Sequence, residues 1–339
     1  MNREDRILFA CVRQEFQPRH RKTVEALAGP AVRWEHVADT AEWHGVAPIV
    51  GANLRRCDPD ALGMPAELAE RMEVAAFENA LLKERRAQRL AEGLVQLREV
   101  GLEAMLLKGA ALDLLVYEEP WVVRSGDVDL LLRPLPGFRP GPEEKQVRLS
   151  LYRSGVECDL LEHHDVNMNG VLPVSFERIW RDARPVQVRG VEAWVMAPED
   201  LLISLCINSC RKRFFRLKGL FDMAETVRRL HLDWGALGAK ARDYSCEGIV
   251  YVALLAAGAT VGCDLPDGAL AELGVPPLRA RLLRALVSWS LRVSSLAAVR
   301  GPALSLLLPY ASYRWDQAWR SFRFALTRPP RPVARTATP

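Results

Sequence analysis

The stretch from Ala104 to Arg133 constrains the fold of this chain more than any other part of the sequence. An apolar strand, a Lys108-Gly109 turn, a short helix and a second strand that opens on Asp127 and Asp129 are predicted there in that order. Side chains alternate between the two faces of a strand, so both aspartates are expected to point the same way while the valine between them enters the core. The stretch therefore predicts two carboxylates at the start of one strand face.

Two such carboxylates suit a hard divalent cation. Mg2+ prefers one or two carboxylates together with substrate phosphates, and paired ions stabilise the attacking and leaving oxygens of an in-line displacement. Phosphoryl or nucleotidyl transfer is therefore the first hypothesis. A bare Asp-x-Asp more often marks solvated acids at a strand edge, but here it follows a strand, a Lys-Gly turn, a helix and Arg124. That order favours the metal site.

Composition excludes several classes of protein. With 339 residues, 49% of them hydrophobic and 26% charged, the chain is an ordinary globular sequence with room for two domains or one domain and a large helical extension. No secretory segment or membrane span is visible. The seven cysteines form no Cys-x-x-Cys pair, which indicates thiols in the cytoplasm, and Cys206 and Cys210 fit a helical core better than a structural zinc site.

Four regions are predicted along the chain. Residues 1–100 read as helical, with helices near 34–45 and from Pro48, His44 as a packed or capping residue, and a long amphipathic helix over 65–100. The catalytic core follows at 101–197, a helical region at 198–310, and a basic, Pro-rich, partly disordered tail at 311–339. The Arg-rich end suits RNA, a phosphate-rich ligand or an acidic partner, although a soluble helix with a frayed end explains it equally well.

Two strands are predicted after the Pro/Gly-rich loop that follows the acidic strand, at 146–152 and 156–164, joined as a hairpin. One face of the second strand begins with three apolar residues, so we expect it to touch the core and to carry Glu162 at its end. Glu162 is then the candidate third metal-binding or base carboxylate, whereas Glu157 and Asp159 fall on the solvent face. A shift of one residue in the register would exchange the two sets.

Further elements are predicted downstream of this pair. A short hairpin is expected over 186–195, and helices over 199–213, 216–230, 234–242, 246–261 and 278–299. Lys218 and Asp222 are four residues apart in the second of these helices, which is compatible with an ordinary helix salt bridge or with a lysine that reaches nucleotide phosphates.

Several ordered blocks together resemble the uncharacterised bacterial nucleotidyltransferases of the DNA polymerase β-like superfamily, over about residues 30 to 262. The blocks are W-x8-W-H-G-V-A-P at 34–48, L-L-K-G-x2-L-x4-Y at 106–117, R-x2-D-V-D-L-L at 124–131, Glu162-x-His164, and R-L-K-x-L-x-D at 216–222.

The resemblance implies an α+β fold, with a small mixed sheet of the nucleotidyltransferase type, flanking helices, and helical N-terminal and C-terminal regions. It implies an NTP substrate and Mg2+ or Mn2+ held by Asp127, Asp129 and Glu162. The implied nucleotide-binding residues are Lys108, Gly109, Arg124, His164, Lys218 and Asp222.

Two departures from the family pattern affect the prediction of activity. Gly109-Ala110 stands where a Gly-Ser is common, which removes a hydroxyl contact to phosphate and leaves the backbone N–H groups of the helix N-terminus. The interval between the acidic strand and Glu162 is also shorter than in similar proteins, which usually place a helix and further strands there.

Two functions from different classes are consistent with these residues. One is a nucleotidyltransferase that moves an NMP from an NTP to an unknown acceptor and releases pyrophosphate; a small molecule, peptide or protein is a better acceptor than RNA, which only the Arg-rich end suggests. The other is a catalytically impaired nucleotide-binding partner protein in a biosynthetic pathway, suggested by the two departures.

Overall fold

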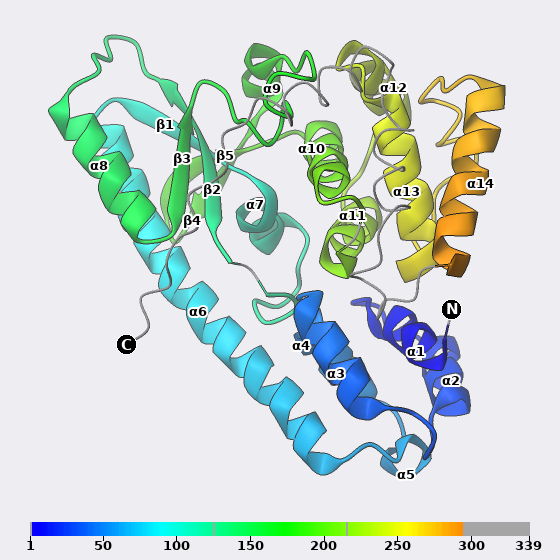
Figure 1. The fold of residues 1–339 in the computed structure, drawn as a ribbon. Helices are drawn as coiled ribbons and strands as arrows, with labels where there is room; N and C mark the ends of the chain where they lie inside the picture. The colour runs from blue at the N-terminus through cyan, green and yellow to red at the C-terminus, as the bar shows by residue number, and fades with distance from the viewer. Residues whose placement is uncertain (1, 125, 215, 294–339) are drawn as a thin grey trace, which may run out of the picture.

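One five-stranded mixed sheet lies at the centre of the sequence and is covered by helices from both ends of the chain (Figure 1). The computed structural model describes residues 2–124, 126–214 and 216–293. Its strand order is β3-β2-β1-β5-β4, with β2 antiparallel to β1 and parallel to β3, β1 parallel to β5, and β5 antiparallel to β4. The strands are β1 (Leu102–Leu106), β2 (Val128–Pro134), β3 (Val156–Leu160), β4 (Arg184–Val188) and β5 (Val191–Val195). The predicted α+β class and mixed sheet are confirmed.

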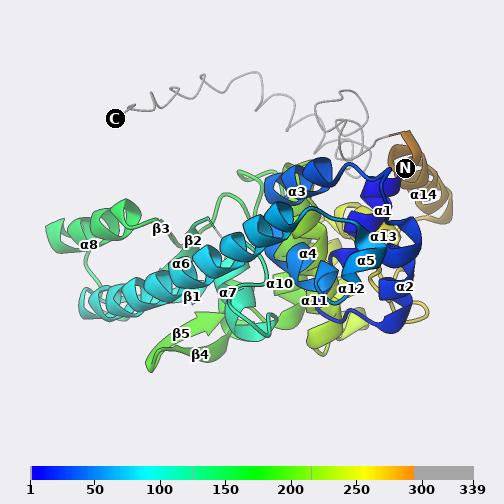
Figure 2. The ribbon, with the colours of Figure 1, turned by 90° about the horizontal axis from the view of Figure 1, so that it is seen from below.

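The segment before the sheet is helical, as predicted. Its helices are α1 (Arg3–Cys11), α2 (Pro18–Leu27), α3 (Trp34–Trp43), α4 (Ala47–Leu54), α5 (Pro59–Leu62) and α6 (Ala66–Glu99). The 34-residue α6 packs against α3 and α4 with its first half and against β1 and β5 with its second half (Figures 1 and 2). A Cβ at Gly51 of α4 would lie 2.6 Å from the Met72 Cβ, so the missing side chain allows α4 and α6 to approach this closely.

Three helices accompany the strands: α7 (Lys108–Leu115), α8 (Pro142–Arg153) and α9 (Phe176–Asp182). The predicted strand at 146–152 is wrong, because α8 covers it. Pro142 begins this helix, and two glutamates lie in its first turn. The apolar residues Val147, Leu149 and Leu151 alternate as in a strand, but Leu149 is half exposed while Val147 and Leu151, four residues apart, pack inward.

The position of α8 changes the topology. The chain passes through α8 between β2 and β3, so these two strands pair in parallel. The predicted hairpin of two strands at 146–152 and 156–164 is therefore absent. The predicted second strand is also shorter than expected, since β3 ends at Leu160. The helix that the family pattern expects in this interval is thus present, whereas the described residues between β2 and β3 form no further strand.

The downstream region contains α10 (Pro198–Arg211), α11 (Leu217–Arg229), α12 (Trp234–Asp243), α13 (Glu247–Val261) and α14 (Pro277–Val293). The hairpin predicted over 186–195 is confirmed by β4 and β5, and the first four helices match their predicted ranges to within two residues. The predicted last helix and the basic tail extend beyond residue 293, outside the described residues. Buried apolar side chains from all three regions form one continuous core. Within the described ranges, no helix has the length and apolarity needed to cross a membrane.

Candidate active site

Asp127 and Asp129 lie at the start of β2, with the buried Val128 between them. Both aspartates line a cavity of about 840 Å3 that is bounded by the sheet, α7, α10, α11 and the end of α3. Val128 belongs to the other sheet face, where it lines a small cavity with Lys83 and Leu90 of α6. The predicted alternation of the two aspartates is therefore present. Asp129 is 5% exposed, whereas Asp127 is exposed.

Glu157, rather than Glu162, lies beside the two aspartates. The strand register pairs Glu157 with Asp129 on neighbouring parallel strands, and both residues line the large cavity. Glu162 follows the end of β3 and lies in a separate hollow of about 380 Å3, where the Asn167 Nδ2 donates to its Oε2 at 3.3 Å. Glu162 was expected on the cavity face because side chains alternate along a strand. Leu161, with a φ of 67°, interrupts this alternation just before Glu162.

The apolar face of β3 does pack against the core, as predicted, but it is not the face that looks toward the two aspartates. Val156, Cys158 and Leu160 share the face that lies with Val128 and packs toward α6 and α8, while the cavity opens on the opposite face. Both faces of this sheet are covered, so the more apolar face of β3 cannot be identified from the sequence as the one beside the site. Only the parallel pairing with β2 decides which residues of β3 lie beside the two aspartates.

Lys108 begins α7 with a φ of 47°, which turns the chain sharply out of β1. Its Nζ lies 2.6 Å from the Asp165 Oδ2 and 3.1 Å from the Asp129 Oδ2. Burial disfavours the charged ammonium, but the two carboxylates outweigh it and raise the pKa of Lys108. Burial likewise disfavours ionised Asp129, yet hydrogen bonding with His163 and the Lys108 charge lower its pKa. Both groups are therefore ionised at neutral pH.

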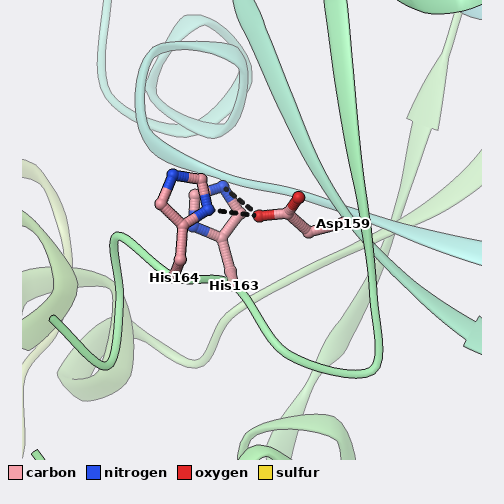
Figure 3. Close-up of side chains that lie close together, drawn as sticks. All are labelled: Asp159, His163 and His164. Atoms are coloured by element: carbon pink, nitrogen blue, oxygen red, sulfur yellow. Dashed lines mark hydrogen bonds and ion pairs between the residues drawn. The ribbon is translucent and has the colours of Figure 1, made fainter. Parts of the chain in front are cut away.

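A cluster of Asp159, His163 and His164 (Figure 3), together with Asp165, supports this pair from the β3 side. The Asp165 backbone N–H donates to the His163 Nδ1 at 3.2 Å, so the ring proton of the neutral imidazole is on Nε2. That Nε2 lies 3.7 Å from an Asp129 oxygen and 3.6 Å from an Asp159 oxygen. His163, 1% exposed, thus directs its N–H toward the two carboxylates.

Asp165 was not predicted, and it is the most connected acid of the site. It accepts from Lys108, pairs with Arg211 of α10, and lies 3.2 Å from the His164 Nε2. Burial disfavours its charge, but Lys108 and Arg211 lower its pKa far below the ordinary value. His164, predicted to bind nucleotide, lines the large cavity while its Nδ1 lies 2.9 Å from the Asp159 Oδ2.

The cavity wall opposite the β2 and β3 acids is basic. Besides the predicted Lys218, the α10–α11 segment contributes Arg211, Lys212 and Arg216. Lys212 makes no ion pair with any described residue, and its pKa is lowered by burial and by the charges of Lys108 and Lys218. The basic run at 211–218 is visible in the sequence, but only the fold turns it toward the acidic strands.

The salt bridge predicted for Lys218 is present, and the contact with nucleotide phosphates stays a prediction. Its Nζ lies 2.6 Å from the Asp222 Oδ2, as expected of an i,i+4 pair, and the residue also lines the cavity. The Tyr117 hydroxyl donates to the other Asp222 oxygen at 2.5 Å. Burial first, and then Asp222, raise the pKa of Tyr117, so the hydroxyl stays a donor. Asp222, which was also predicted to bind nucleotide, lines the cavity as well and orients Lys218 there.

Predicted Gly109 and Arg124 also line the cavity. Gly109 is in the first turn of α7, which no described side chain caps, so the backbone N–H groups of that turn remain available to an anion. Arg124 is exposed, and its backbone N–H donates to the Gly45 carbonyl at 3.2 Å. The prediction that His44 packs or caps is confirmed, because its Nδ1 accepts from the Leu217 N–H at the start of α11 at 3.1 Å.

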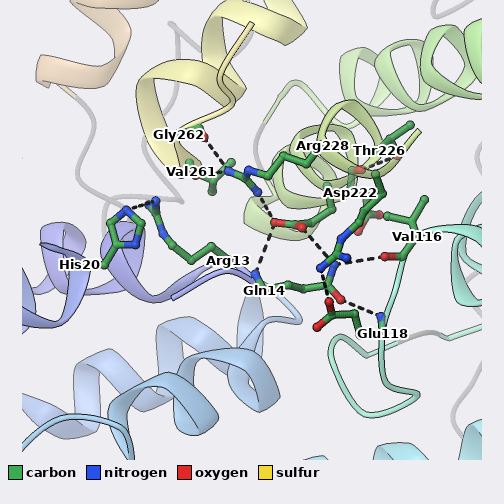
Figure 4. Close-up of polar contacts among 12 residues, drawn as sticks. Arg13, Gln14, His20, Val116, Glu118, Asp222, Thr226, Arg228, Val261 and Gly262 are labelled. Carbon is green, nitrogen blue, oxygen red and sulfur yellow. Dashed lines mark hydrogen bonds and ion pairs between the residues drawn. The ribbon is translucent and has the colours of Figure 1, made fainter. Parts of the chain in front are cut away.

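The N-terminal segment braces α11 against the loop that follows α7 (Figure 4). Gln14 donates to the Val116 carbonyl at 3.2 Å and to the Glu225 Oε2 at 3.0 Å, and its own Oε1 accepts from the Glu118 N–H at 2.9 Å. Arg228 pairs with Glu225 and donates to the Gly262 carbonyl at 2.6 Å. This network fixes α11, and with it Lys218 and Asp222, relative to α7.

Two donor sets could hold a cation. Asp127, Asp129 and Glu157 offer only oxygen, as Mg2+ and Mn2+ prefer. Asp159, His163 and His164 place one potential ligand atom each within 4.8 Å of one another. His163 accepts a hydrogen bond at Nδ1 and carries its ring proton on Nε2. Neither ring nitrogen of His163 therefore has a free lone pair for a cation in this arrangement. The ligand chemistry of the three carboxylates suits Mg2+ or Mn2+, whereas among the described residues only Asp159, His163 and His164 bring three ligand atoms within 4.8 Å of one another.

A comparison with protein-family models matches the chain to one described as "Uncharacterised nucleotidyltransferase", over residues 30–136 and 137–262. These segments cover more than half of the chain and include every residue described above as lining the large cavity. No curated protein and no solved structure matches the chain.

Proposed function

The chain belongs to the uncharacterised nucleotidyltransferase family, and from that premise we propose that it transfers an NMP from an NTP to an acceptor hydroxyl with Mg2+ or Mn2+. The acceptor oxygen forms a bond to the α-phosphorus, the bond from that phosphorus to the β-bridging oxygen breaks, and pyrophosphate leaves while the hydroxyl proton passes to solvent. A small molecule, peptide or protein is the proposed acceptor.

One observation carries this proposal. Three carboxylates from two adjacent parallel strands face a single cavity whose opposite wall supplies four basic side chains. Asp127, Asp129 and Glu157 would hold the divalent cation, which supplies charge stabilisation to the attacking and leaving oxygens. Glu157 takes the place that the sequence pattern assigned to Glu162.

The basic wall and the start of α7 are proposed to bind the triphosphate. Lys212 and Lys218 face the cavity, and the uncapped first turn of α7 presents backbone N–H groups at Gly109. These groups compensate for the missing hydroxyl at Ala110, because a helix N-terminus binds phosphate through its backbone alone. Arg124 is proposed to neutralise phosphate charge at the cavity border.

Lys108 is proposed to act mainly by positioning. Its Nζ is held between Asp129 and Asp165, so it fixes the Asp129 carboxylate for the cation rather than reaching freely toward phosphate. The His163 N–H supports the same carboxylate from the other side. Geometry and charge balance, rather than a covalent intermediate, would then account for the rate.

The alternative of an impaired nucleotide-binding protein rested on two sequence departures. Helix α8 occupies the interval thought to lack a helix, and the α7 N-terminus offers phosphate contacts without a serine.

The seven cysteines are all free thiols, which fits a proposed reducing compartment such as the cytoplasm.

The test is pyrophosphate release from each of the four NTPs with Mg2+ or Mn2+, alongside mass spectrometry of candidate acceptors. Wild-type protein is expected to release pyrophosphate in a metal-dependent way, and Asp129→Asn to lose it. Release that continues unchanged in Asp129→Asn would remove the carboxylate site from the reaction. Binding of NTP and metal with no release from any nucleotide would favour the impaired partner.

A further inference from the structure

A second cavity, of about 500 Å3, adjoins the nucleotidyl-transfer cavity. It lies between the first half of α6 and the α3–α4 connection, with Arg124 at its border. Its volume is within the range of sites that bind small molecules. The two cavities share Glu42, Gly45 and Arg124 as a common border, so a molecule in the second cavity can reach the first.

The charge of the second cavity excludes a triphosphate. Glu67, Glu70 and Glu78 of α6 are exposed, line it, and form no ion pair or hydrogen bond with a described residue. Arg71 does not neutralise them, because its guanidinium lies 2.6 Å from Glu42 and 2.7 Å from Asp39. The unpaired acids repel phosphate and attract a cation.

A buried polar group independently indicates a ligand with hydrogen-bond donors. Asn79, 3% exposed, lines this cavity. Its Nδ2 donates to the Val123 carbonyl at 2.8 Å and to the Trp121 carbonyl at 3.1 Å, which fixes the orientation of the amide. The Asn79 Oδ1 accepts no hydrogen bond from a described residue. A buried acceptor without a partner is costly, so a donor in the cavity would be stabilised.

Apolar side chains complete the wall. Val74 and Leu82 line the cavity and are 48% and 42% exposed, which leaves apolar surface on α6 beside the acidic groups. A ligand that matches this lining has a positively charged donor and an apolar portion.

We propose that the second cavity binds the acceptor of the reaction, and that this acceptor is a small molecule with a protonated amine, an apolar part and the hydroxyl that is modified. The assignment rests on the proposed function. Arg124 at the shared border separates the amine subsite from the phosphates, and the acceptor hydroxyl crosses that border toward Asp127.

The test compares three probes of similar shape on the full chain by ligand-observed NMR. Tyramine carries an amine, 4-ethylphenol is neutral, and 3-(4-hydroxyphenyl)propionate is anionic. Tyramine is expected to bind about fivefold more tightly than 4-ethylphenol, and the anion more weakly still, because exposed ion pairs contribute up to about a factor of five each. The variant Glu70→Gln/Glu78→Gln is expected to weaken tyramine about fivefold and to leave 4-ethylphenol unchanged.

The matched control is Glu92→Gln/Glu99→Gln, which neutralises two exposed glutamates of the same helix outside the cavity. Equal affinity for the three probes, or an equal loss of tyramine affinity in the two double variants, overturns the inference. Metal-dependent pyrophosphate release in the same protein would leave the proposed function standing. If no NTP yields pyrophosphate while tyramine binding still depends on Glu70 and Glu78, the proposed function fails and the acceptor assignment fails with it.

Discussion

Glu157 and Glu162 provide the sharpest test of the proposed site, since they are only five positions apart and each could complete the carboxylate set. Glu157→Gln is expected to lower kcat/KM for pyrophosphate release about a thousandfold. Glu162→Gln is expected to change it less than about twofold, as substitutions at exposed positions usually do.

The magnitude follows from where each group lies. Glu157 is paired in register with Asp129 and faces the same cavity, so glutamine removes a full negative charge from the cation's surroundings. One charge about 4 Å from another contributes about 4 kcal/mol near a protein surface, and about 1.4 kcal/mol corresponds to a factor of ten in rate. Glu162 lies in an adjoining hollow and contacts Asn167, and it does not line the cavity that contains the proposed cation site.

The assay is steady-state pyrophosphate release at several Mg2+ concentrations. Glu157→Gln should also raise the Mg2+ concentration needed for half-maximal rate, because a ligand is lost. Unfolding in urea, followed by circular dichroism, is expected to be the same for both variants and for wild type. A large loss in Glu162→Gln with a small loss in Glu157→Gln would refute the register argument and restore the assignment made from the sequence pattern.

Three further predictions concern the basic wall and the helices around it. Lys212→Ala should raise the KM for NTP about tenfold, or about 1.4 kcal/mol, while Lys145→Ala on the exposed face of α8 should not, as NTP titrations would measure. Tyr117→Phe should lower the free energy of unfolding by about 1–3 kcal/mol in urea titrations, because the buried Asp222 loses a donor. Burial, and then Arg216, lower the pKa of His44 to about 3. The unfolded imidazole takes up a proton below about pH 6.5 and the folded one does not, so stability falls as pH drops from about 6.5 toward 3. His44→Gln should remove about 2 kcal/mol of that loss by pH 5 in urea titrations; an unchanged pH dependence would contradict it.

Much of the fold was predictable from the sequence, because its elements carry strong local signals. The apolar stripe of α6 repeats over many turns, and Pro198 with two acids predicts the start of α10. The placement of Asp127 and Asp129 followed from strand alternation alone. Helix α8 was missed because its apolar residues alternate over a short span, where the periods of helix and strand are hard to distinguish.

The remaining site residues depend on tertiary pairing. Glu157 reaches the cavity only through the parallel register of β2 and β3, which local pattern does not encode. Asp165 and Lys212 come from a loop and a helix end whose roles appear once α10 faces the sheet. Local sequence identifies the residues of one strand, whereas a site built from several elements requires their packing.

The two partners of Lys108 bear on how the acidic strand would respond to the proposed cation. Two carboxylates hold its ammonium, with Asp165 at 2.6 Å and Asp129 at 3.1 Å. A buried charge that loses its partner is strongly destabilising, so a lysine paired with Asp129 alone would be left unpaired when a cation takes that carboxylate. Asp165 would remove this cost, because Lys108 would retain the closer of its two partners if Asp129 held the proposed cation. The same acid also pairs with Arg211 of the basic wall, so the acidic strand and the basic wall of the cavity are linked through one residue.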